Sequence, residues 1–534
     1  MTQGAPAMLW LGVETPEAEI SDELVGSKAA GIWRMARLGL RTPPAFALPT
    51  TLCAAANADP RAARKLVSEG LRAGLERLEA ATGRQLGDAR APLLVSVRSG
   101  AAKSMPGMLS TVLNVGLGPE TTHGLIRQSG DPRFAWDNYR RFIESYAAVV
   151  GGAPSAAFAR PLAELVRAEA AADESELDGE ALERLASAHA DLVARVTAHP
   201  IPTDPFDQLT EAALAVFQSW NAPKAREYRR LNGLEGLAGT AVTVQAMVFG
   251  NSGAASGSGV AFSRSPATGE GPLYVDFLFD AQGEDVVSGR RTPVGAGELA
   301  ARLPGVYAAL GEGAARLERA FADVQDIEFT VEKGELFFLQ TRSAKRAPRA
   351  ALRIAVDLVR EGVIDPGTAL ARLEEVDLAK AGASRFADAQ PPLAVGVAAA
   401  PGVASGRAAF DSASAERLAT AGEPVILVRA EPATDDIAGF AAAAGVLTAV
   451  GGRTAHAAVV ARQMAKVCVV GCADLHIDET AKTARLAGER LGEGDWLSLD
   501  GDTGAVTLGR RAIVHEDPRA ELAEIEGWKA AAAA

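Results

Sequence analysis

The chain has 534 residues, of which 48% are hydrophobic, and its formal net charge is −13. A chain of this length is expected to fold into about three or four domains, each with its own core. The acidic balance argues against a general binder of nucleic acid or of an acidic membrane, because no domain-wide basic surface is available to meet phosphates. Nucleotide binding is not excluded, since it needs only local cations.

The three cysteines, Cys53, Cys468 and Cys472, are too few for a disulfide framework and indicate a reducing compartment. We interpret Cys468 and Cys472 as small buried side chains rather than as a metal or redox pair. The chain opens without the charged and apolar regions of a signal peptide, and no stretch approaches the roughly 18 apolar residues of a membrane span. We therefore expect a cytoplasmic protein.

The first predicted element is a Gly-Ser turn running into an amphipathic helix over Leu24–Leu40, ended by the prolines that follow. Lys28 lies at the start of this helix, where its flexible ammonium group could reach a phosphate. The alternative is an ordinary solvated surface charge.

A buried strand is predicted over Leu93–Val97, and Arg98 follows it directly. A planar guanidinium at a strand end can bond two phosphate oxygens at once, although a structural Arg paired with a carboxylate is the alternative. Gly107 comes shortly afterwards, between two methionines.

Residues 120–235 have the composition and periodicity of a mostly helical section. Arg133, Arg140 and Arg141 are phosphate candidates there, but such charges on helix faces usually serve solubility.

The section from Thr240 to Arg342 is predicted to turn to strands. It contains a Gly/Ser loop with Gly253, Gly257 and Gly259, whose backbone N–H groups could close over a triphosphate. A flexible surface hairpin explains the same composition.

A hairpin is predicted over Asp323–Arg342, with Asp326 and Glu328 on one face of its first strand and apolar residues turned to the core. The return strand brings Gln340 and Arg342 alongside. Two carboxylates and an amide oxygen suit Mg²⁺, which prefers hard oxygen ligands and completes its shell with phosphate and water. The alternative is an amphipathic hairpin with a solvated polar face.

The most informative stretch is Gly451–Gly471, GGRTAHAAVVARQMAKVCVVG. Buried strands are predicted before it, at Pro424–Val428 and Ala444–Val450, and a further strand at Val467–Val470. A Gly-Gly turn leads into a helix for which Thr454 is a plausible N-cap.

This arrangement places His456 in the first helical turn, beside unpaired backbone N–H groups and the positive end of the helix dipole. The dipole disfavours the imidazolium, so more of the side chain is neutral and nucleophilic, and the N–H groups can receive phosphoryl oxygens. A phosphohistidine is favoured, while a His packed there for structural reasons is the alternative.

The stretch resembles the phosphohistidine signature of pyruvate phosphate dikinase, with Arg453 in place of Met and Ala455 in place of Ser. Phosphoenolpyruvate synthase and the first enzyme of the sugar phosphotransferase system carry related signatures. The segment containing SMPGM points to the phosphate-using branch. Further segments resemble the dikinase nucleotide domain, in its order: GSKAAGIWRMARLGL, LLVSVRSGAAKSMPGMLSTVLNVG, DPRFAWDNYRRF, QAMVFGNSGAASGSGVAFSR, AQGEDVVSGRRTP and QDIEFTVEKGELFFLQTRSAKR.

The resemblance implies roles for individual residues. Lys28 and Arg98 would bind ATP phosphates, with Arg98 also assisting catalysis, and Gly107 would belong to a loop near them. The Gly257 loop would cover the γ-phosphate. Asp326, Glu328 and Gln340 would hold Mg²⁺. Arg342 would bind the phosphates, and His456 would be the nucleophile.

Three further positions matter for the resemblance. Asp276 stands where the family has Glu, and Asp280 where it has Asn, so a contact to nucleotide or metal could be shifted. Thr454 matches the threonine that a regulatory protein phosphorylates in plant members, although helix capping alone explains it.

The expected fold class is α/β and α+β multidomain, with an ATP-grasp nucleotide-binding domain that includes a helical section and is linked to a swivelling α/β phosphohistidine domain. The expected nucleotide-binding half has a first ATP-grasp part (1–119), a helical section (120–235) and a second ATP-grasp part with the Mg-ATP site (236–345). A helical linker (346–388), the phosphohistidine domain (389–510) and a C-terminal tail (511–534) are expected to follow.

The resemblance implies that Mg·ATP and inorganic phosphate bind in the N-terminal part. His456 would then take the β-phosphoryl group, leaving AMP and pyrophosphate. In the complete family this group passes to pyruvate and forms phosphoenolpyruvate on a C-terminal barrel. No segment here resembles that barrel, so we expect a truncated dikinase whose acceptor domain lies on another chain.

Two alternatives stay open. One is a phosphohistidine phosphotransferase for a different small molecule or protein. The other is a catalytically decayed ATP-binding regulatory protein, although such a protein would not require a nucleophilic His.

Overall fold

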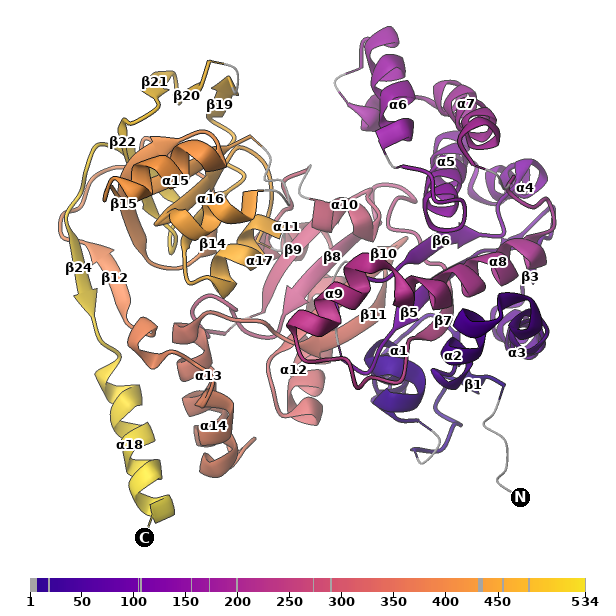
Figure 1. Ribbon diagram of the computed structural model, residues 1–534, viewed down its shortest axis with the longest axis horizontal. Coiled ribbons are helices and arrows are strands. Elements are labelled where there is room, and N and C mark those ends of the chain that lie inside the picture. The colour runs from indigo at the N-terminus through magenta and orange to yellow at the C-terminus, as the bar shows by residue number, and fades with distance from the viewer. Residues whose placement is uncertain are drawn as a thin grey trace. The chain divides into compact units, whose positions relative to one another are not determined.

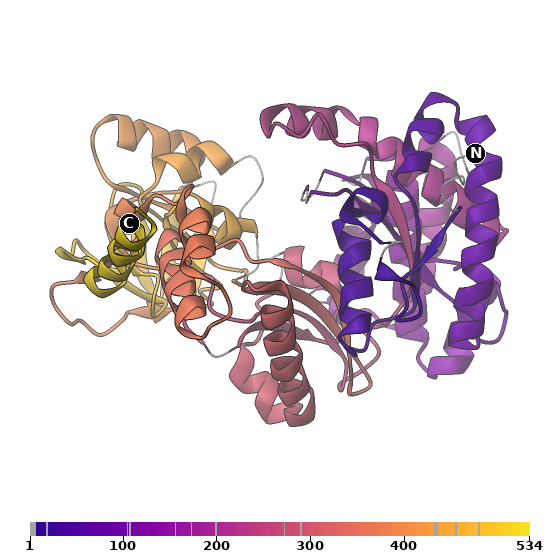
Figure 2. The ribbon, with the colours of Figure 1, turned by 90° about the horizontal axis from the view of Figure 1, so that it is seen from below.

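The computed structural model describes residues 7–17, 20–103, 105, 108–154, 156–171, 173–197, 200–271, 273–288, 291–430, 436–453, 456–478 and 481–533 (Figure 1, Figure 2). The chain divides into two compact units. The first comprises Met1–Val248 and Phe337–Gln340, and the second comprises Phe249–Leu336 and Thr341–Ala534.

The first unit is built on an antiparallel sheet with the strand order β1-β2-β7-β5-β6. The central strands β2, β5 and β7 are buried along almost their whole length, so they form part of the hydrophobic core. Helices α1 (Asp22–Arg37), α3 (Pro60–Thr82) and α8 (Pro205–Gln218) pack against it. The strands are Leu9–Trp10 (β1), Ala45–Leu48 (β2), Val95–Gly100 (β5), Thr111–Val115 (β6) and Ala241–Ala246 (β7).

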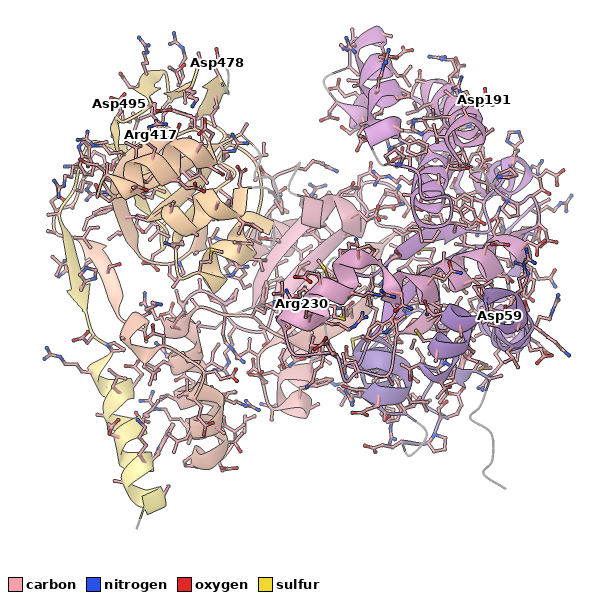
Figure 3. The ribbon with its side chains drawn as sticks, in the orientation of Figure 1. Asp59, Asp191, Arg230, Arg417, Asp478 and Asp495 are labelled. Atoms are coloured by element: carbon pink, nitrogen blue, oxygen red, sulfur yellow. The ribbon has the colours of Figure 1, made fainter. Side chains whose placement is uncertain are left out.

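Helix α3 shows how local sequence sets these elements. The Asp59 side chain (labelled in Figure 3) accepts hydrogen bonds from two N–H groups of the first turn, and Pro60 follows at the first helical position. Gly83 ends the helix in the left-handed conformation. Gly74 gives Phe46 room on the sheet, because a Cβ there would lie 2.4 Å from the Phe46 ring.

The prediction of a helical section is confirmed. The Asp137 carboxylate accepts from Arg140 and Arg141, and Arg140 also bonds Glu144 and Glu174. These arginines are therefore held in a structural ion-pair network rather than presented on a solvated face. The helices of this section are Pro119–Ser129 (α4), Pro132–Val149 (α5), Ala156–Ala168 (α6), Gly179–Val196 (α7), Pro205–Gln218 (α8) and Pro223–Leu231 (α9).

The second unit opens with a sheet of strand order β11-β10-β8-β9, except that Phe337–Gln340 of β11 group with the first unit. The predicted hairpin is confirmed, since β10 (Gln325–Glu332) and β11 (Glu335–Ser343) flank a tight turn at Lys333 and Gly334. The other two strands are Gly257–Phe262 (β8) and Tyr274–Phe279 (β9).

The section between 240 and 342 contains the predicted strands, but it is not made of strands alone. Helices α10 (Gly283–Ser288), α11 (Ala296–Arg302) and α12 (Pro304–Phe321) lie between β9 and β10. In α12 the buried Val306, Leu310 and Leu317 recur at helical spacing, so the sequence did carry the signal.

The linker is helical as expected, with α13 (Pro348–Arg360) and α14 (Pro366–Leu373). The tail is not wholly helical. Its β24 (Ile513–Glu516) pairs antiparallel with β12 (Ala383–Phe386) before α18 (Arg519–Ala533) begins. Helix α18 then places Ile525 in one core with residues of α13 and α14, which lie beside it in both views (Figure 1, Figure 2).

The C-terminal part of the second unit is an α/β domain whose sheet has the order β13-β23-β22-β15-β16-β17-β18-β14. The pairs from β15 to β18 are parallel, and their apolar side chains form a core on each face. Residues of α15 (Ser412–Thr420), α16 (Ile437–Ala442) and α17 (His456–Gln463) complete one core. Residues of the small sheet β19-β20-β21 complete the other.

The predicted strands around the histidine stretch are confirmed as β16 (Val425–Arg429), β17 (Gly445–Thr448) and β18 (Val467–Val470). The remaining strands of this sheet and of the small one are Ala394–Val395 (β13), Val397–Ala400 (β14), Val403–Ala409 (β15), Leu475–Asp478 (β19), Thr483–Leu486 (β20), Glu489–Gly492 (β21), Trp496–Asp500 (β22) and Ala505–Leu508 (β23).

Candidate functional site

Lys28 is brought to the strand that carries Arg98. The backbone of α1 is interrupted at Gly26, with φ 79° and ψ 154°, and the Ser27 N–H and hydroxyl both donate to the Ala101 carbonyl. A Cβ on Gly100 would lie 3.7 Å from the Lys28 Cβ. Since alternate residues of a strand face the same side, Arg98 and Gly100 share one face of β5, and Lys28 meets that face.

The glycine predicted near these cations cannot be placed with them. Gly107 lies outside the described residues. Of its two neighbouring methionines, Met105 is buried.

The hairpin places Asp326 and Glu328 on the same side of β10, as predicted. Arg342 Nε donates to Asp326 Oδ2 at 2.8 Å, while the buried Asp326 Oδ1 has no hydrogen-bond partner among the described residues. Burial raises the pKa of Asp326, and the charge of Arg342 opposes this rise. Gln340 lies on β11, in the short stretch that groups with the first unit.

The oxygen donors of this hairpin fit Mg²⁺ in number and kind. Mg²⁺ is usually held by one or two carboxylates together with phosphate oxygens and water, and Asp326 and Glu328 provide two carboxylates. The described residues contain no group of three or more His, Cys, Asp or Glu side chains that could hold a metal by themselves. Water or phosphate oxygens would complete the coordination.

The placement of Gly257 and Gly259 in a loop is wrong, because both lie on strand β8. A Cβ on Gly257 would fall 2.1 Å from the ring of Phe277, and one on Gly259 would fall 2.6 Å from the ring of Phe329. These glycines make room for two stacked aromatic rings in the sheet. Of the three glycines predicted to lie in the loop, Gly253 does lie in the loop before β8, with φ 108°.

Asp280 has a structural role that the sequence analysis missed. It directly follows β9 and has φ 47°, a conformation that Asp and Asn tolerate better than other side chains, and its Oδ1 accepts from the Gly253 N–H at 3.2 Å. The substitution of Asp for the Asn of the family thus keeps an acceptor for the glycine loop. Asp276, the other departure, is buried on β9, with Oδ2 3.1 Å from where a Gly452 Cβ would lie.

His456 is the first residue of α17, which follows β17 and leads into the parallel strand β18. The carboxyl ends of parallel strands are where ligands bind in α/β sheets. The backbone therefore places His456 at the binding edge of the sheet and at a helix N-terminus. Its side chain, Thr454 and Ala455 lie outside what the structure describes.

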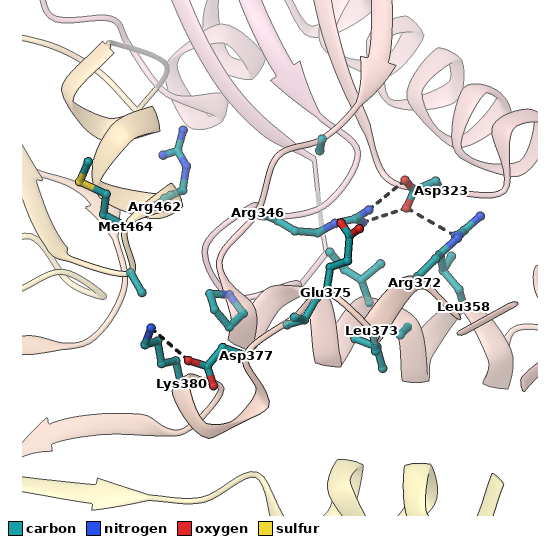
Figure 4. A pocket seen from close by; sticks show the side chains of 17 residues that line it. Asp323, Arg346, Leu358, Arg372, Leu373, Glu375, Asp377, Lys380, Arg462 and Met464 are labelled. Atoms are coloured by element: carbon teal, nitrogen blue, oxygen red, sulfur yellow. Dashed lines mark hydrogen bonds and ion pairs between the residues drawn. The ribbon is translucent and has the colours of Figure 1, made fainter. Parts of the chain in front are cut away.

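The second unit also holds a cavity of about 430 Å³ that the sequence did not indicate (Figure 4). Arg346 forms two bonds to Asp323, Arg372 lies 3.6 Å from the same carboxylate, and Arg462 lines the cavity from α17. In the described part of the chain, none of the predicted ATP or Mg²⁺ residues lines it.

Comparison with known proteins agrees with this architecture. Residues 61–295 match the pyruvate phosphate dikinase AMP/ATP-binding domain, and residues 421–504 match the mobile domain of PEP-utilising enzymes. These matches define a protein that joins a nucleotide-binding domain to a mobile domain.

Almost the whole chain is similar to plant pyruvate, phosphate dikinases. Pyruvate, phosphate dikinase 2 of Zea mays is 42% identical over 510 residues, which cover 95% of this chain and 58% of the relative. The chloroplastic enzyme of Flaveria trinervia is 42% identical, with 95% and 53% covered, and that of Mesembryanthemum crystallinum is 43% identical, with 95% and 54% covered. The chain belongs to the pyruvate phosphate dikinase family, and it spans little more than half the length of these relatives.

Within the described residues, no helix combines the length and the apolar character needed to cross a bilayer.

Proposed function

We propose that this chain is a phosphotransferase that moves a phosphoryl group from ATP to His456. The nucleotide would bind in an ATP-grasp domain formed by residues 1–119 and 236–345, with the helical section 120–235 inserted. Residues 389–510 would form the swivelling phosphohistidine domain, reached through the linker 346–388 and followed by the tail 511–534.

The observation that carries the proposal is the position of His456 at the start of α17. The first N–H groups of a helix lack intrahelical partners, so they can receive phosphoryl oxygens, and the helix dipole favours a neutral, nucleophilic imidazole. The match of residues 421–504 to a mobile domain supports the same reading, since one histidine must visit two sites in turn.

In the proposed reaction, the neutral imidazole of His456 attacks the β-phosphorus, the bond to the α-phosphate breaks, and AMP leaves. The bond between the β- and γ-phosphates breaks as the γ-phosphoryl group passes to inorganic phosphate and gives pyrophosphate. The imidazole then loses its ring proton to solvent. Phosphoryl transfer asks mainly for positioning and charge neutralisation, which Lys28, Arg98 and Arg342 would supply to the phosphates.

Asp326 and Glu328 would hold Mg²⁺, with Gln340 as a further oxygen donor, and the ion would neutralise phosphate charge. The orphaned Oδ1 of Asp326 supports this assignment, because a buried carboxylate oxygen without a partner is costly unless a ligand completes it. The loop that carries Gly253 and leads into β8 at Gly257 would lie over the γ-phosphate. Gly107 is assigned to a loop near the phosphates by resemblance alone.

The test is transfer of label from ATP labelled at the β-phosphorus, in the presence of Mg²⁺ and phosphate. We expect acid-labile, base-stable label on the protein, together with AMP and pyrophosphate. His456→Asn should abolish the label, and His476→Asn, at an exposed histidine of the same domain, should leave it unchanged. Label retained by His456→Asn would overturn the proposal, and label formed equally without phosphate would favour a water-using enzyme.

The final acceptor is proposed to be pyruvate, giving phosphoenolpyruvate, at an acceptor domain beyond residues 1–534 or on a separate chain. Adding pyruvate to the labelled protein tests this directly. Label that leaves only with another small molecule or protein would identify a different acceptor. Failure of ATP to label an ATP-binding protein would identify a decayed regulatory protein instead.

We propose a cytoplasmic location, because three cysteines are too few for a disulfide framework. Thr454, two residues before His456 in sequence, is proposed as a regulatory phosphorylation site by resemblance to the plant enzymes.

A further inference from the structure

Arg453 and Tyr274 converge on one backbone carbonyl in the second unit. The Tyr274 hydroxyl, on β9, donates to the Ala398 oxygen at 3.2 Å. Arg453 Nε donates to the same oxygen at 2.9 Å, and the Arg453 guanidinium carbon lies 4.4 Å from the centroid of the Tyr274 ring. A planar cation over an aromatic face is attractive, so the two side chains hold each other as well as β14.

The backbone around Arg453 packs closely against the neighbourhood of β9. A Cβ on Gly452 would lie 2.5 Å from Pro293 and 3.1 Å from Asp276 Oδ2. A Cβ on Gly471 would lie 3.0 Å from Thr292, and Gly471 has φ 59°. Both ends of the segment 452–471, which contains α17, therefore approach Thr292 and Pro293, and Gly452 also approaches Asp276 of β9.

Arg453 is also the residue at which this chain departs from the dikinase signature, which has Met there. A methionine cannot donate a hydrogen bond to the Ala398 oxygen and carries no charge for the Tyr274 ring. The contact is thus specific to the residue present in this chain, and it lies in the loop that leads directly to His456.

We propose that Arg453 and Tyr274 form a latch that holds the phosphohistidine segment on β9 of the nucleotide-binding part. The latch is a positioning device: neither side chain reacts, and release of the Arg453 guanidinium from Tyr274 frees the mobile domain to leave. The inference rests on the proposed function, in which His456 must dock for transfer and then depart. A stronger latch should favour the docked state at the expense of departure.

The docked state can be followed without any chemistry. Cysteines introduced at the exposed positions Glu312 of α12 and Glu416 of α15 can carry spin labels. Double electron–electron resonance would then report the distance between the nucleotide-binding part and the phosphohistidine domain. The native cysteines are buried and can stay in place. We expect one dominant distance in the parent protein and at least a threefold rise in the population at other distances in Arg453→Met.

Tyr274→Phe should give a smaller shift, since it keeps the ring and removes only the hydroxyl. If the two side chains act as a unit, the double variant should resemble Arg453→Met alone. Arg407→Met is the matched control, because Arg407 stacks on Trp496 at 4.5 Å within the phosphohistidine domain and should leave the distance distribution unchanged. An unchanged distribution in Arg453→Met overturns the latch.

Labelling kinetics separate this inference from the proposed function. In Arg453→Met we expect the rate of His456 labelling to fall at least tenfold, with ATP affinity by calorimetry unchanged. An equal loss of ATP affinity would assign Arg453 to nucleotide binding and overturn the latch. A shifted distance distribution in a protein that ATP never labels would support the latch while the proposed function fails.

Discussion

Gly26 packs so closely on Gly100 that a Cβ at position 26 would lie 2.2 Å from the Gly100 carbonyl oxygen. Its φ of 79° and ψ of 154° are also closed to residues with a side chain. This contact is what sets Lys28 against the face of β5 that carries Arg98. The placement of Lys28 against the strand of Arg98 thus depends on the close approach of two glycines.

We expect Gly26→Ala to weaken ATP binding at least tenfold and to destabilise the first unit by about 3 kcal/mol, because the backbones must separate. Calorimetric titration with Mg·ATP and thermal unfolding measure the two effects. Gly83→Ala is the control. Gly83 has φ 67° with nothing within 4 Å of its Cβ position, so it should lose about 1 kcal/mol through strain alone. Equal loss of ATP affinity in both variants would contradict the proposed geometry.

A second prediction concerns the buried ion pairs of α5. Asp137 is buried between Arg140 and Arg141, so Asp137→Asn should destabilise the protein by about 3–5 kcal/mol at neutral pH, measured by urea unfolding. Glu164→Gln, in the exposed pair with Arg160, should have no measurable effect. A loss of similar size in both variants would show that the buried network has no special weight.

The ion pairs of Asp137 with Arg140 and Arg141 also predict how the stability of the protein depends on pH. Burial alone would raise the pKa of Asp137, but Arg141 and Arg140 outweigh it and hold the pKa below the ordinary value of 3.8. A depressed folded-state pKa contributes stability that is fully present above pH 3.8 and is lost as pH falls toward the folded-state value. The difference between the parent protein and Asp137→Asn should therefore be constant near neutrality and shrink below pH 3.8.

The glycine loop gives a third prediction. Asp280→Asn should leave ATP affinity unchanged, because Asn tolerates positive φ and keeps an acceptor for the Gly253 N–H. Asp280→Gly relieves the backbone but removes the acceptor, so it should weaken ATP binding by roughly threefold to tenfold, the worth of one hydrogen bond. Titration of the three proteins with Mg·ATP decides the matter. Full affinity in Asp280→Gly would show that the loop needs no such anchor.

The fourth prediction concerns the C-terminal helix. Ile525 of α18 is buried in the core that contains Leu352 and Val356, so Ile525→Ala should cost about 2–5 kcal/mol locally. We expect faster amide hydrogen exchange in α13, α14 and α18. Glu526→Ala, on the exposed side of the same helix, should leave exchange unchanged in α13 and α14. Unchanged exchange in Ile525→Ala would mean that α18 does not support the linker.

Several elements could be predicted because their signals are local. Strands β16, β17 and β18 are short apolar runs, and the start of α17 at His456 follows from a Gly-Gly turn between two of them. The alternation in β10 placed Asp326 and Glu328 on one side correctly. In each case neighbouring residues alone determine the conformation.

Other features depended on partners distant in the chain. The pairing of β12 with β24 brings 383–386 to 513–516, which no local pattern indicates. The Gly/Ser composition around Gly257 and Gly259 predicts a loop, because the room that these glycines leave for Phe277 and Phe329 arises only when the strands pack.

The sequence by itself determined the nucleophile candidate, the paired carboxylates and the order of the parts, since each is written in adjacent residues. Only the tertiary structure decided that Arg140 and Arg141 bind carboxylates, that Lys28 meets the strand of Arg98, and that Arg453 meets Tyr274. The reason is physical: a charged side chain is used by whichever partner the folded chain brings within a few ångströms, and burial makes that pairing decisive.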